Sequence, residues 1–130
     1  MANQTRTYSD FDISFDPHPV TGDLLSKLGT AAVVQAVADL VQLNHYEKPF
    51  HPEIGGNVRK LLFEPADEVT SGLLAKEIKN VIVNFEPRVS LLGVYVNATN
   101  DGNGFNAVIE FSVLTVADPI TISIFLQRLR

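Results

Sequence analysis

Apolar residues recur at helical spacing between residues 30 and 86 and at every second position in the last third of the chain. In the stretch 30–43, TAAVVQAVADLVQL, apolar positions three and four apart share one helix face. The members of this stripe are Val33, Val37, Leu40 and Val41. The hydroxyl of Thr30 is suited to accept a free N–H of the first turn. We therefore predict a helix over 30–43, capped by Thr30 and buried along one stripe.

A longer helix is predicted over residues 70–85, TSGLLAKEIKNVIVNF. Its apolar stripe consists of Leu74, Ile78, Val81, Ile82 and Phe85. Pro87 ends this helix at about Glu86, since proline disfavours helical geometry in the residue before it. A short helix is predicted over 57–63, with Asn57 as its cap and with Leu61, Leu62 and Phe63 facing inward.

After residue 88 the apolar pattern becomes an alternation, which is typical of strands with one buried face. Strands are predicted over 89–97 and 105–116, joined by a hairpin loop at Asp101-Gly102. One face of the second strand carries Phe105, Ala107, Ile109, Phe111 and Val113. After a turn at Asp118-Pro119, a last strand alternates Ile120, Ile122, Ile124 and Leu126 with polar residues.

Residues 1–29 lack a helical pattern and contain several prolines and glycines, so we expect an extended N-terminal arm. Its aromatic residues Tyr8, Phe11 and Phe15 indicate that the arm packs onto something, either its own core or a partner. The chain is thus predicted to be a single α+β domain over 1–130. In it the arm (1–29) and the helical part (30–86) pack on one face of a mainly antiparallel, three-stranded C-terminal meander (89–130).

Composition narrows the function classes. The net charge is −5 and the ten basic residues are scattered, whereas nucleic-acid binding needs concentrated Lys and Arg. The absence of cysteine removes zinc-ribbon and thiol chemistry. The polar start, MANQTRTYSDFD, predicts no signal peptide, and no apolar run is long enough to predict membrane insertion. We expect neither nucleic acid nor a membrane as a partner.

The sequence contains no recognisable catalytic or metal motif. His51 and Glu53 could contribute to a metal site, but backbone bonding of a loop histidine is the favoured interpretation. Two carboxylates could form a glycosidase, and Glu53, Glu64 and Glu86 each lie beside a proline in or near loops. We predict no catalytic residue, no metal and no cofactor, and keep a glycosidase as the alternative.

Four short segments occur in a fixed order: YSDFD (8–12), PFHPEIGG (49–56), KLLFE (60–64) and NFEPR (84–88). Together they resemble the baseplate wedge or sheath-initiator proteins of contractile-tailed phages, with counterparts in type VI secretion systems. The resemblance implies a structural protein of the virion tail baseplate, present in six copies and assembled in the host bacterial cytoplasm. It implies the wedge proteins, the tail sheath protein and the inner tube as partners. The label "lysozyme-like", which this family carries, keeps a peptidoglycan-cleaving glycosidase as the alternative.

The resemblance also implies two sets of site residues. Glu86 and Arg88 are expected to project on either side of Pro87, at a corner that docks on wedge proteins, with Phe50 and Pro52 extending the contact. Glu86 and Arg88 could instead pin the corner internally, and Phe50 and Pro52 could pack in the core.

The last strand is expected to template the first sheath ring by strand exchange, because a strand at a sheet edge offers unpaired backbone groups. The residues of this second set are Ile120, Ile122, Ile124, Leu126 and Arg128. Arg128 and Arg130 are expected to blunt the end of the strand against self-association. The alternative is an ordinary edge strand that ends in solvent.

Overall fold

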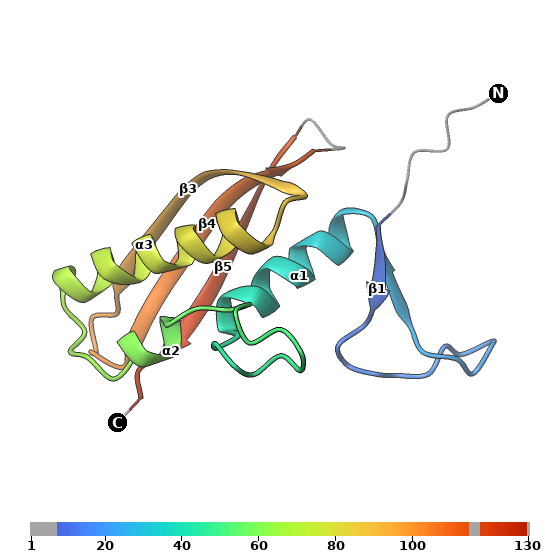
Figure 1. Ribbon diagram of the computed structural model, residues 1–130, viewed down its shortest axis with the longest axis horizontal. Coiled ribbons are helices and arrows are strands. Elements are labelled where there is room, and N and C mark those ends of the chain that lie inside the picture. Colours follow the sequence, from blue (N-terminus) through green and yellow to red (C-terminus); the bar gives the residue numbers. More distant parts are fainter. Residues whose placement is uncertain (1–7, 115–117, 130) are drawn as a thin grey trace.

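The computed structural model describes residues 8–114 and 118–129. The predicted end of the second strand at 115–116, the residue Arg130 and residues 1–7 of the arm lie outside the described residues. Along the chain the elements are β1 (Ser9–Phe11), β2 (Ser26–Leu28), α1 (Thr30–Gln42), α2 (Val58–Leu61), α3 (Glu68–Phe85), β3 (Val89–Ala98), β4 (Gly104–Val113) and β5 (Pro119–Gln127) (Figure 1). This order of helices and strands confirms the predicted α+β class.

The C-terminal strands form an antiparallel sheet in the order β3-β4-β5, as the meander prediction requires. Nine consecutive residue pairs join β4 to β5 without a break, whereas the pairing of β3 with β4 shifts register between Leu91 and Gly93. The β3–β4 turn contains Gly102 at φ 70°, a conformation that glycine adopts without strain. Of the two strands at the edges of this three-stranded sheet, β5 is therefore regular and β3 is irregular.

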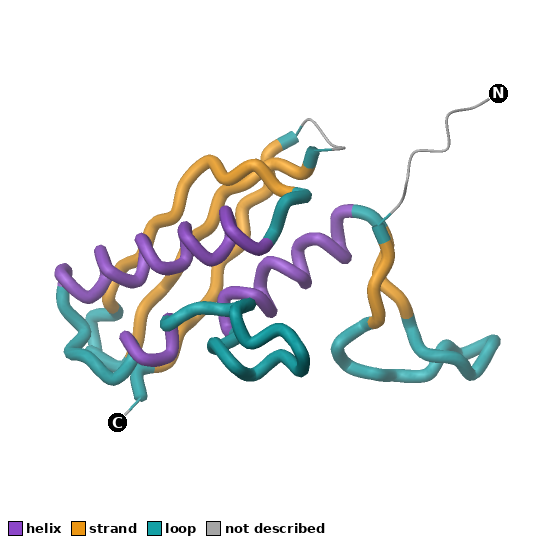
Figure 2. The backbone as a smooth tube through the Cα atoms, in the orientation of Figure 1, coloured by secondary structure: helices purple, strands orange, loops and turns teal. Residues whose placement is uncertain are grey.

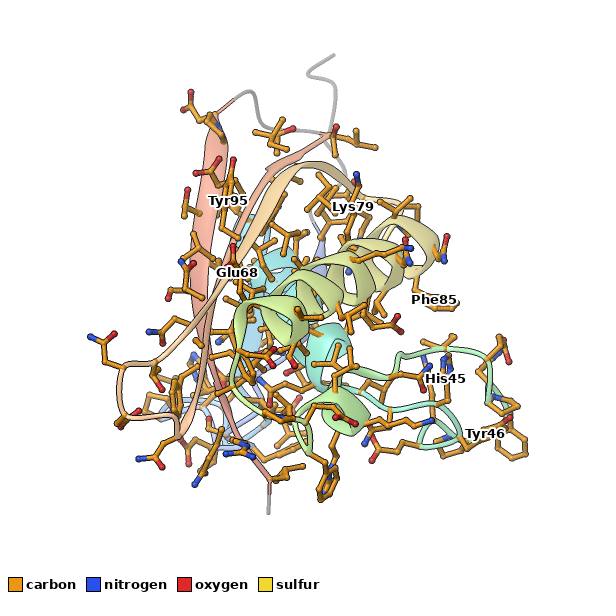
Figure 3. All side chains as sticks on the ribbon, turned by 90° about the vertical axis from the view of Figure 1, so that its left-hand side faces the viewer. His45, Tyr46, Glu68, Lys79, Phe85 and Tyr95 are labelled. Carbon is orange, nitrogen blue, oxygen red and sulfur yellow. The ribbon has the colours of Figure 1, made fainter. Side chains whose placement is uncertain are left out.

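The core lies between one face of this sheet and the helices α1 and α3, which are on the same side of it (Figures 2 and 3). The alternating side chains of β4 are all buried, as predicted, and Phe105, Ile109 and Phe111 are among the largest of them. The stripe of α1 is buried throughout, and that of α3 is buried except for Phe85, which is half-buried. Among the described residues, no helix combines the length and hydropathy of a membrane crossing.

Three details of the helices differ from the predictions. Thr30 is the first residue of α1 and not its cap; that position belongs to Gly29, whose φ of 61° suits glycine and whose N–H donates to Tyr8 O at 2.6 Å. Asn57 does precede α2, but its side chain makes no capping bond. Helix α3 begins two residues before the predicted start, because Asp67 accepts the N–H of Thr70 at 2.8 Å.

The other two corrections concern the surface. The inward position predicted for Phe63 is wrong, since its side chain is 57% exposed while Leu62 is buried. Two short strands, β1 and β2, pair within the arm, so part of it is a hairpin. This hairpin projects beside α1, away from the C-terminal sheet (Figure 1). Its residues Phe11 and Phe15 are 61% and 64% exposed, so they do not pack on the chain's own core.

Candidate functional site

The corner between α3 and β3 is formed by Glu86, Pro87 and Arg88. Glu86 ends the helix, and its N–H still donates to Ile82 O at 3.0 Å. The carbonyl of Arg88 accepts a bond from Leu114 N–H at 3.0 Å, which joins the corner to the end of β4. The backbone on both sides of Pro87 is therefore fixed by the fold.

The two charged side chains of the corner bind each other. Arg88 Nε lies 2.7 Å from Glu86 Oε1 and Arg88 Nη2 lies 2.9 Å from Glu86 Oε2, which is a bidentate pair. Glu86 is 6% exposed and the Arg88 side chain 31%. The hydrogen bonds to Glu86 raise the pKa of Arg88 above its ordinary value, while burial opposes this. The guanidinium also lies over the Tyr8 ring, 5.3 Å from its centroid, at cation–π distance.

This geometry bears on the interpretation of the corner. Glu86 and Arg88 do not project on opposite sides of the proline, because their side chains meet. An internal pin, one of the two expected roles, is thus present in the fold. Pro87 is exposed, and part of Arg88 remains accessible. A docking role for these residues stays a prediction.

A cavity of about 440 Å³ opens beside the corner. Its walls come from the corner itself, from Asp39 and Leu40 of α1, from Leu43 just after that helix, from Lys48 and Ile54 of the following loop, and from Asp10 of β1. Burial, followed by repulsion from Asp10, raises the pKa of Asp39, while Lys27 lowers it. The cavity brings the arm, α1, the loop and the corner together at one place.

The loop 44–56 is ordered by its own hydrogen bonds. Glu47 accepts the backbone N–H and the side-chain amide of Asn44, each at 2.9 Å, and these bonds lower the pKa of Glu47. The loop closes where Gly56 N–H donates to Leu43 O at 3.1 Å. At Gly55, with φ 119°, a Cβ would lie 2.8 Å from the Asn44 carbonyl, so only glycine fits there.

This ordered loop holds two aromatic side chains in solvent. Phe50 is 98% exposed and Tyr46 is 84% exposed, and Tyr46 points away from the body of the protein (Figure 3). Both residues adopt a positive φ, 66° for Phe50 and 70° for Tyr46, which is uncommon for residues other than glycine. The core-packing alternative for Phe50 and Pro52 is wrong, because both are exposed. A strained backbone that presents aromatic surface is typical of a contact site.

Strand β5 forms an edge of the sheet in the described part of the chain, with β4 as its one neighbour. The predicted exchange residues Ile120, Ile122, Ile124 and Leu126 turn their side chains toward the core. The side chains on the opposite face of the strand, among them Phe125 at 56%, are exposed. What β5 offers a neighbour is its backbone edge together with this outer face.

Arg128 and Leu129, which follow β5, are bound to the body of the domain. Arg128 Nε donates to Glu64 O at 3.1 Å, and Arg128 N–H donates to Asn103 O at 2.8 Å. Leu129 N–H donates to Leu62 O at 2.9 Å. Arg128 therefore fixes the end of the strand to the segment after α2, and does not extend freely beyond it.

Glu53 and Glu86, two of the three candidate carboxylates, are already engaged by neighbouring groups. A general acid needs a raised pKa, but hydrogen bonds from its own backbone N–H and from His51 lower the pKa of Glu53. Glu86 is engaged by Arg88. His51 Nδ1 lies 3.2 Å from Glu53 Oε1, so the favoured interpretation of a backbone-bonded histidine ring is replaced by a side-chain pair. The described residues contain no group of three or more side chains placed to bind a metal.

Two parts of this surface were missed by reasoning from sequence. Tyr46 and the contact of Tyr8 with Arg88 were not singled out, and neither motif nor spacing marks them. The exposed apolar face of the arm had one signal, the alternation of aspartates with apolar residues at 10–16, which is also found in strands that pack on their own core.

The family model for the baseplate wedge protein gp25 matches residues 27–116. A curated relative, the baseplate wedge protein gp25 of Enterobacteria phage T4, is 29% identical over 122 residues, which is 92% of this chain and 90% of that protein.

Solved structures share the fold. A chain in the baseplate of the anti-feeding prophage, determined by cryo-electron microscopy with six-fold symmetry, superimposes with a TM-score of 0.73 and 20% identity, covering 86% of this chain and 90% of that one. A putative tail lysozyme from Geobacter sulfurreducens superimposes with a TM-score of 0.71 and 18% identity, covering 78% and 92%. At these identities the likeness shows a common fold and not a common activity.

Proposed function

Because the chain belongs to the family of the baseplate wedge protein gp25, we propose that it acts as a sheath initiator, docking on wedge proteins and templating the first sheath ring. Family membership makes it a structural component of a contractile-tail baseplate. The proposal adds the two contacts and the absence of catalysis. The observation that carries it is the unpaired, regular edge of β5.

The edge of β5 suits the addition of a strand from a sheath subunit. Its nine residues pair with β4 without a bulge, so the opposite edge is also regular. Strand β3, the other edge, is interrupted at Leu91 and Gly93, and irregularities of this kind discourage pairing. Backbone bonds along β5 would supply affinity, and the exposed Thr121, Ser123 and Phe125 would supply specificity.

The wedge contact is placed at the corner and the neighbouring loop. Pro87, the accessible part of Arg88, Phe50 and Pro52 are proposed to touch the wedge, while Glu86 orients Arg88. Phe50 is the strongest support, because a rigid, almost fully exposed aromatic side chain is costly to leave in water and is often a hot spot at interfaces.

The wider setting follows from the same family. We propose six copies per baseplate. The number is supported by the six-fold symmetry of the anti-feeding prophage baseplate, in which one chain shares this fold. The proposed location is the virion tail baseplate, assembled in the host bacterial cytoplasm beside the sheath and the inner tube. A secretion-system baseplate would use the same two contacts.

Amide hydrogen exchange tests the β5 contact. Deleting the strand would also remove Ile124 and Leu126 from the core, so exchange of the intact protein is preferable. Adding purified sheath protein from the same genome should slow the outward amides of β5 by at least about tenfold, since new hydrogen bonds protect them. The amides of β3 are the internal control and should not change. Protection of β3 without β5 would contradict the proposed edge.

The wedge contact is tested by Phe50→Ser. Because Phe50 touches little of its own domain, the variant should keep the thermal stability of the wild type. Its affinity for the co-expressed wedge proteins should fall by about tenfold or more. Val69→Ser, which alters an apolar residue 72% exposed at the far end of α3, is the matched control. Equal binding by both variants would remove Phe50 from the interface.

A further inference from the structure

The N-terminal hairpin, residues 9–28, carries apolar side chains on one face of its ribbon and charged side chains on the other. In the register of β1 and β2, Ser9 pairs with Leu28 and Phe11 with Ser26, so Phe11 and Leu28 share one face of the ribbon. The pair Asp10 and Lys27 occupies the other face. Alternation along a strand fixes this division.

Burial of Lys27 and the position of Asp10 show which face of the ribbon lies toward α1. Phe11 and Leu28 are 61% and 60% exposed, while the Lys27 side chain is half-buried and lies 3.9 Å from Asp12. Asp10, although exposed, lines the cavity beside α1, and both Asp10 and Lys27 act electrostatically on Asp39 of that helix. A ribbon that packs only on its own domain has the opposite arrangement, with apolar side chains inward. The apolar face is therefore available to another molecule.

The loop of the hairpin exposes further apolar side chains. Ile13, Phe15 and Val20 are 60%, 64% and 85% exposed. The loop is nevertheless ordered, because His18 N–H donates to Asp23 O at 2.6 Å and His18 Nδ1 accepts the N–H of Val20 at 3.1 Å. An ordered apolar protrusion loses little conformational entropy when it is bound.

The base of the hairpin is joined to the corner and to α1. Tyr8 contacts Arg88, and Gln35 of α1 donates from Nε2 to Phe11 O at 2.8 Å and accepts Ile13 N–H at 3.4 Å. The base of the hairpin is thus held against the corner at which wedge docking is proposed.

Charge indicates the kind of partner. Residues 8–29 contain four aspartates and one lysine, and among these aspartates Asp12 alone lies within ion-pair distance of a cation in the described structure. Two such hairpins would repel each other, and an anionic membrane would repel them as well. A surface with lysine and arginine around an apolar centre would attract them.

We propose that the hairpin inserts its Phe11–Leu28 face into an apolar groove, rimmed by Lys and Arg, on the wedge protein that binds the corner. This inference rests on the proposed wedge docking. It adds a second contact and names the chemistry of its partner surface.

The experiment compares two double variants for binding to the immobilised, co-expressed wedge proteins. Phe11→Ser with Leu28→Ser should raise Kd by about tenfold or more, since two exposed apolar side chains lose their burial. Val69→Ser with Leu73→Ser, which are 72% and 49% exposed on α3, should change it less than about twofold. Thermal melts of both double variants should match the wild type.

The salt dependence of binding tests whether lysine and arginine surround the proposed groove. Asp16→Asn with Asp23→Asn should weaken binding at low salt, and the difference from the wild type should largely disappear at about 0.5 M salt, where exposed charges are screened. A difference that is independent of salt, or no difference at low salt, would overturn the basic rim.

The remaining outcomes separate the two proposals. If Phe50→Ser weakens wedge binding and the hairpin double variant does not, the hairpin inference is wrong and the wedge contact stands. If the wild type does not bind the wedge proteins, both fail. If the wild type dimerises in sedimentation and Phe11→Ser abolishes this, the face binds a second copy of the chain. If the wild type binds phosphatidylglycerol vesicles and Phe11→Ser abolishes this, the face binds a membrane. Either result would overturn the inference.

Discussion

Removing Arg88 should cost the fold more than neutralising Glu86. In Arg88→Ala the carboxylate of Glu86, which is 6% exposed, loses both guanidinium bonds and keeps only the long contact of 3.4 Å to the backbone N–H of residue 88. In Glu86→Gln the guanidinium keeps water contact, because 31% of the arginine side chain is exposed, and the amide oxygen can still accept a bond. The asymmetry follows from which charge is left buried.

The magnitude can be estimated from burial. Removing one partner of a fully buried pair costs about 3–5 kcal/mol. Since Arg88 is partly exposed, we expect about 2–3 kcal/mol for Arg88→Ala, including the lost contact with Tyr8. Glu86→Gln should cost about 1 kcal/mol. For a domain of this size, the arginine variant should melt about 6–10 °C below the wild type.

The assay is urea unfolding followed by circular dichroism for the wild type, the two single variants and the double variant. The double variant should be more stable than the sum of the single effects predicts, by about 1 kcal/mol or more, because the residues act as a pair. Equal costs for the two single variants, or additivity within about 0.3 kcal/mol, would refute the argument from burial. Loss of wedge binding by Arg88→Ala is informative only after this measurement, because a destabilised corner would also weaken docking.

Three further predictions concern stability. Asp39→Asn should stabilise the protein slightly at pH 7, by less than about 0.5 kcal/mol because the carboxylate is partly exposed. In the folded protein the pKa of Asp39 lies above the ordinary 3.8, so the stability of the wild type falls as the pH rises from 3.8 through the folded pKa. Below pH 3.8 the stabilities of the two proteins should converge, which urea unfolding across this pH range measures. Asp67→Ala should lower the Tm, whereas Asp67→Asn, which keeps an oxygen that can accept the capping hydrogen bond, should not. Because hydrogen bonds from Thr70 lower the pKa of Asp67, the loss of stability in Asp67→Ala should shrink as the pH falls below 3.8. Gly55→Ala should cost about 1–3 kcal/mol in urea unfolding, whereas Gly72→Ala, with open space around its Cβ, should gain up to about 1 kcal/mol.

The secondary structure could be predicted because burial on one face imposes a period. The stripe of α1 and the alternation of β4 are buried as their spacing requires, and the ends of helices and strands moved by only a few residues. The start of α3 was missed because its cap is Asp67, which lies before the apolar pattern begins. Local hydrogen bonding decides such boundaries, and an apolar pattern does not report it.

The surface could be predicted less well, for a different reason. An apolar side chain in the sequence has the same transfer free energy whether it faces its own core or a partner, so Phe63 was predicted to face inward and Phe11 could not be placed. The contact between Glu86 and Arg88 depends on how the chain turns around Pro87. The sequence Glu-Pro-Arg is compatible both with an ion pair between the two side chains and with two side chains that point away from each other. Phe50 was singled out by resemblance, and its exposure became known from the fold.

The corner and the apolar protrusions have complementary physical roles. An internally satisfied ion pair contributes little new energy to a partner, since Glu86 is already buried and Arg88 is already paired with it. Through Arg88 and Tyr8, however, the pair fixes where the hairpin leaves the domain. The gain from apolar burial would then come from Phe50 and the Phe11–Leu28 face, which are held at set positions before contact. Docking strength should therefore depend on the apolar residues, and docking geometry on the Glu-Pro-Arg corner.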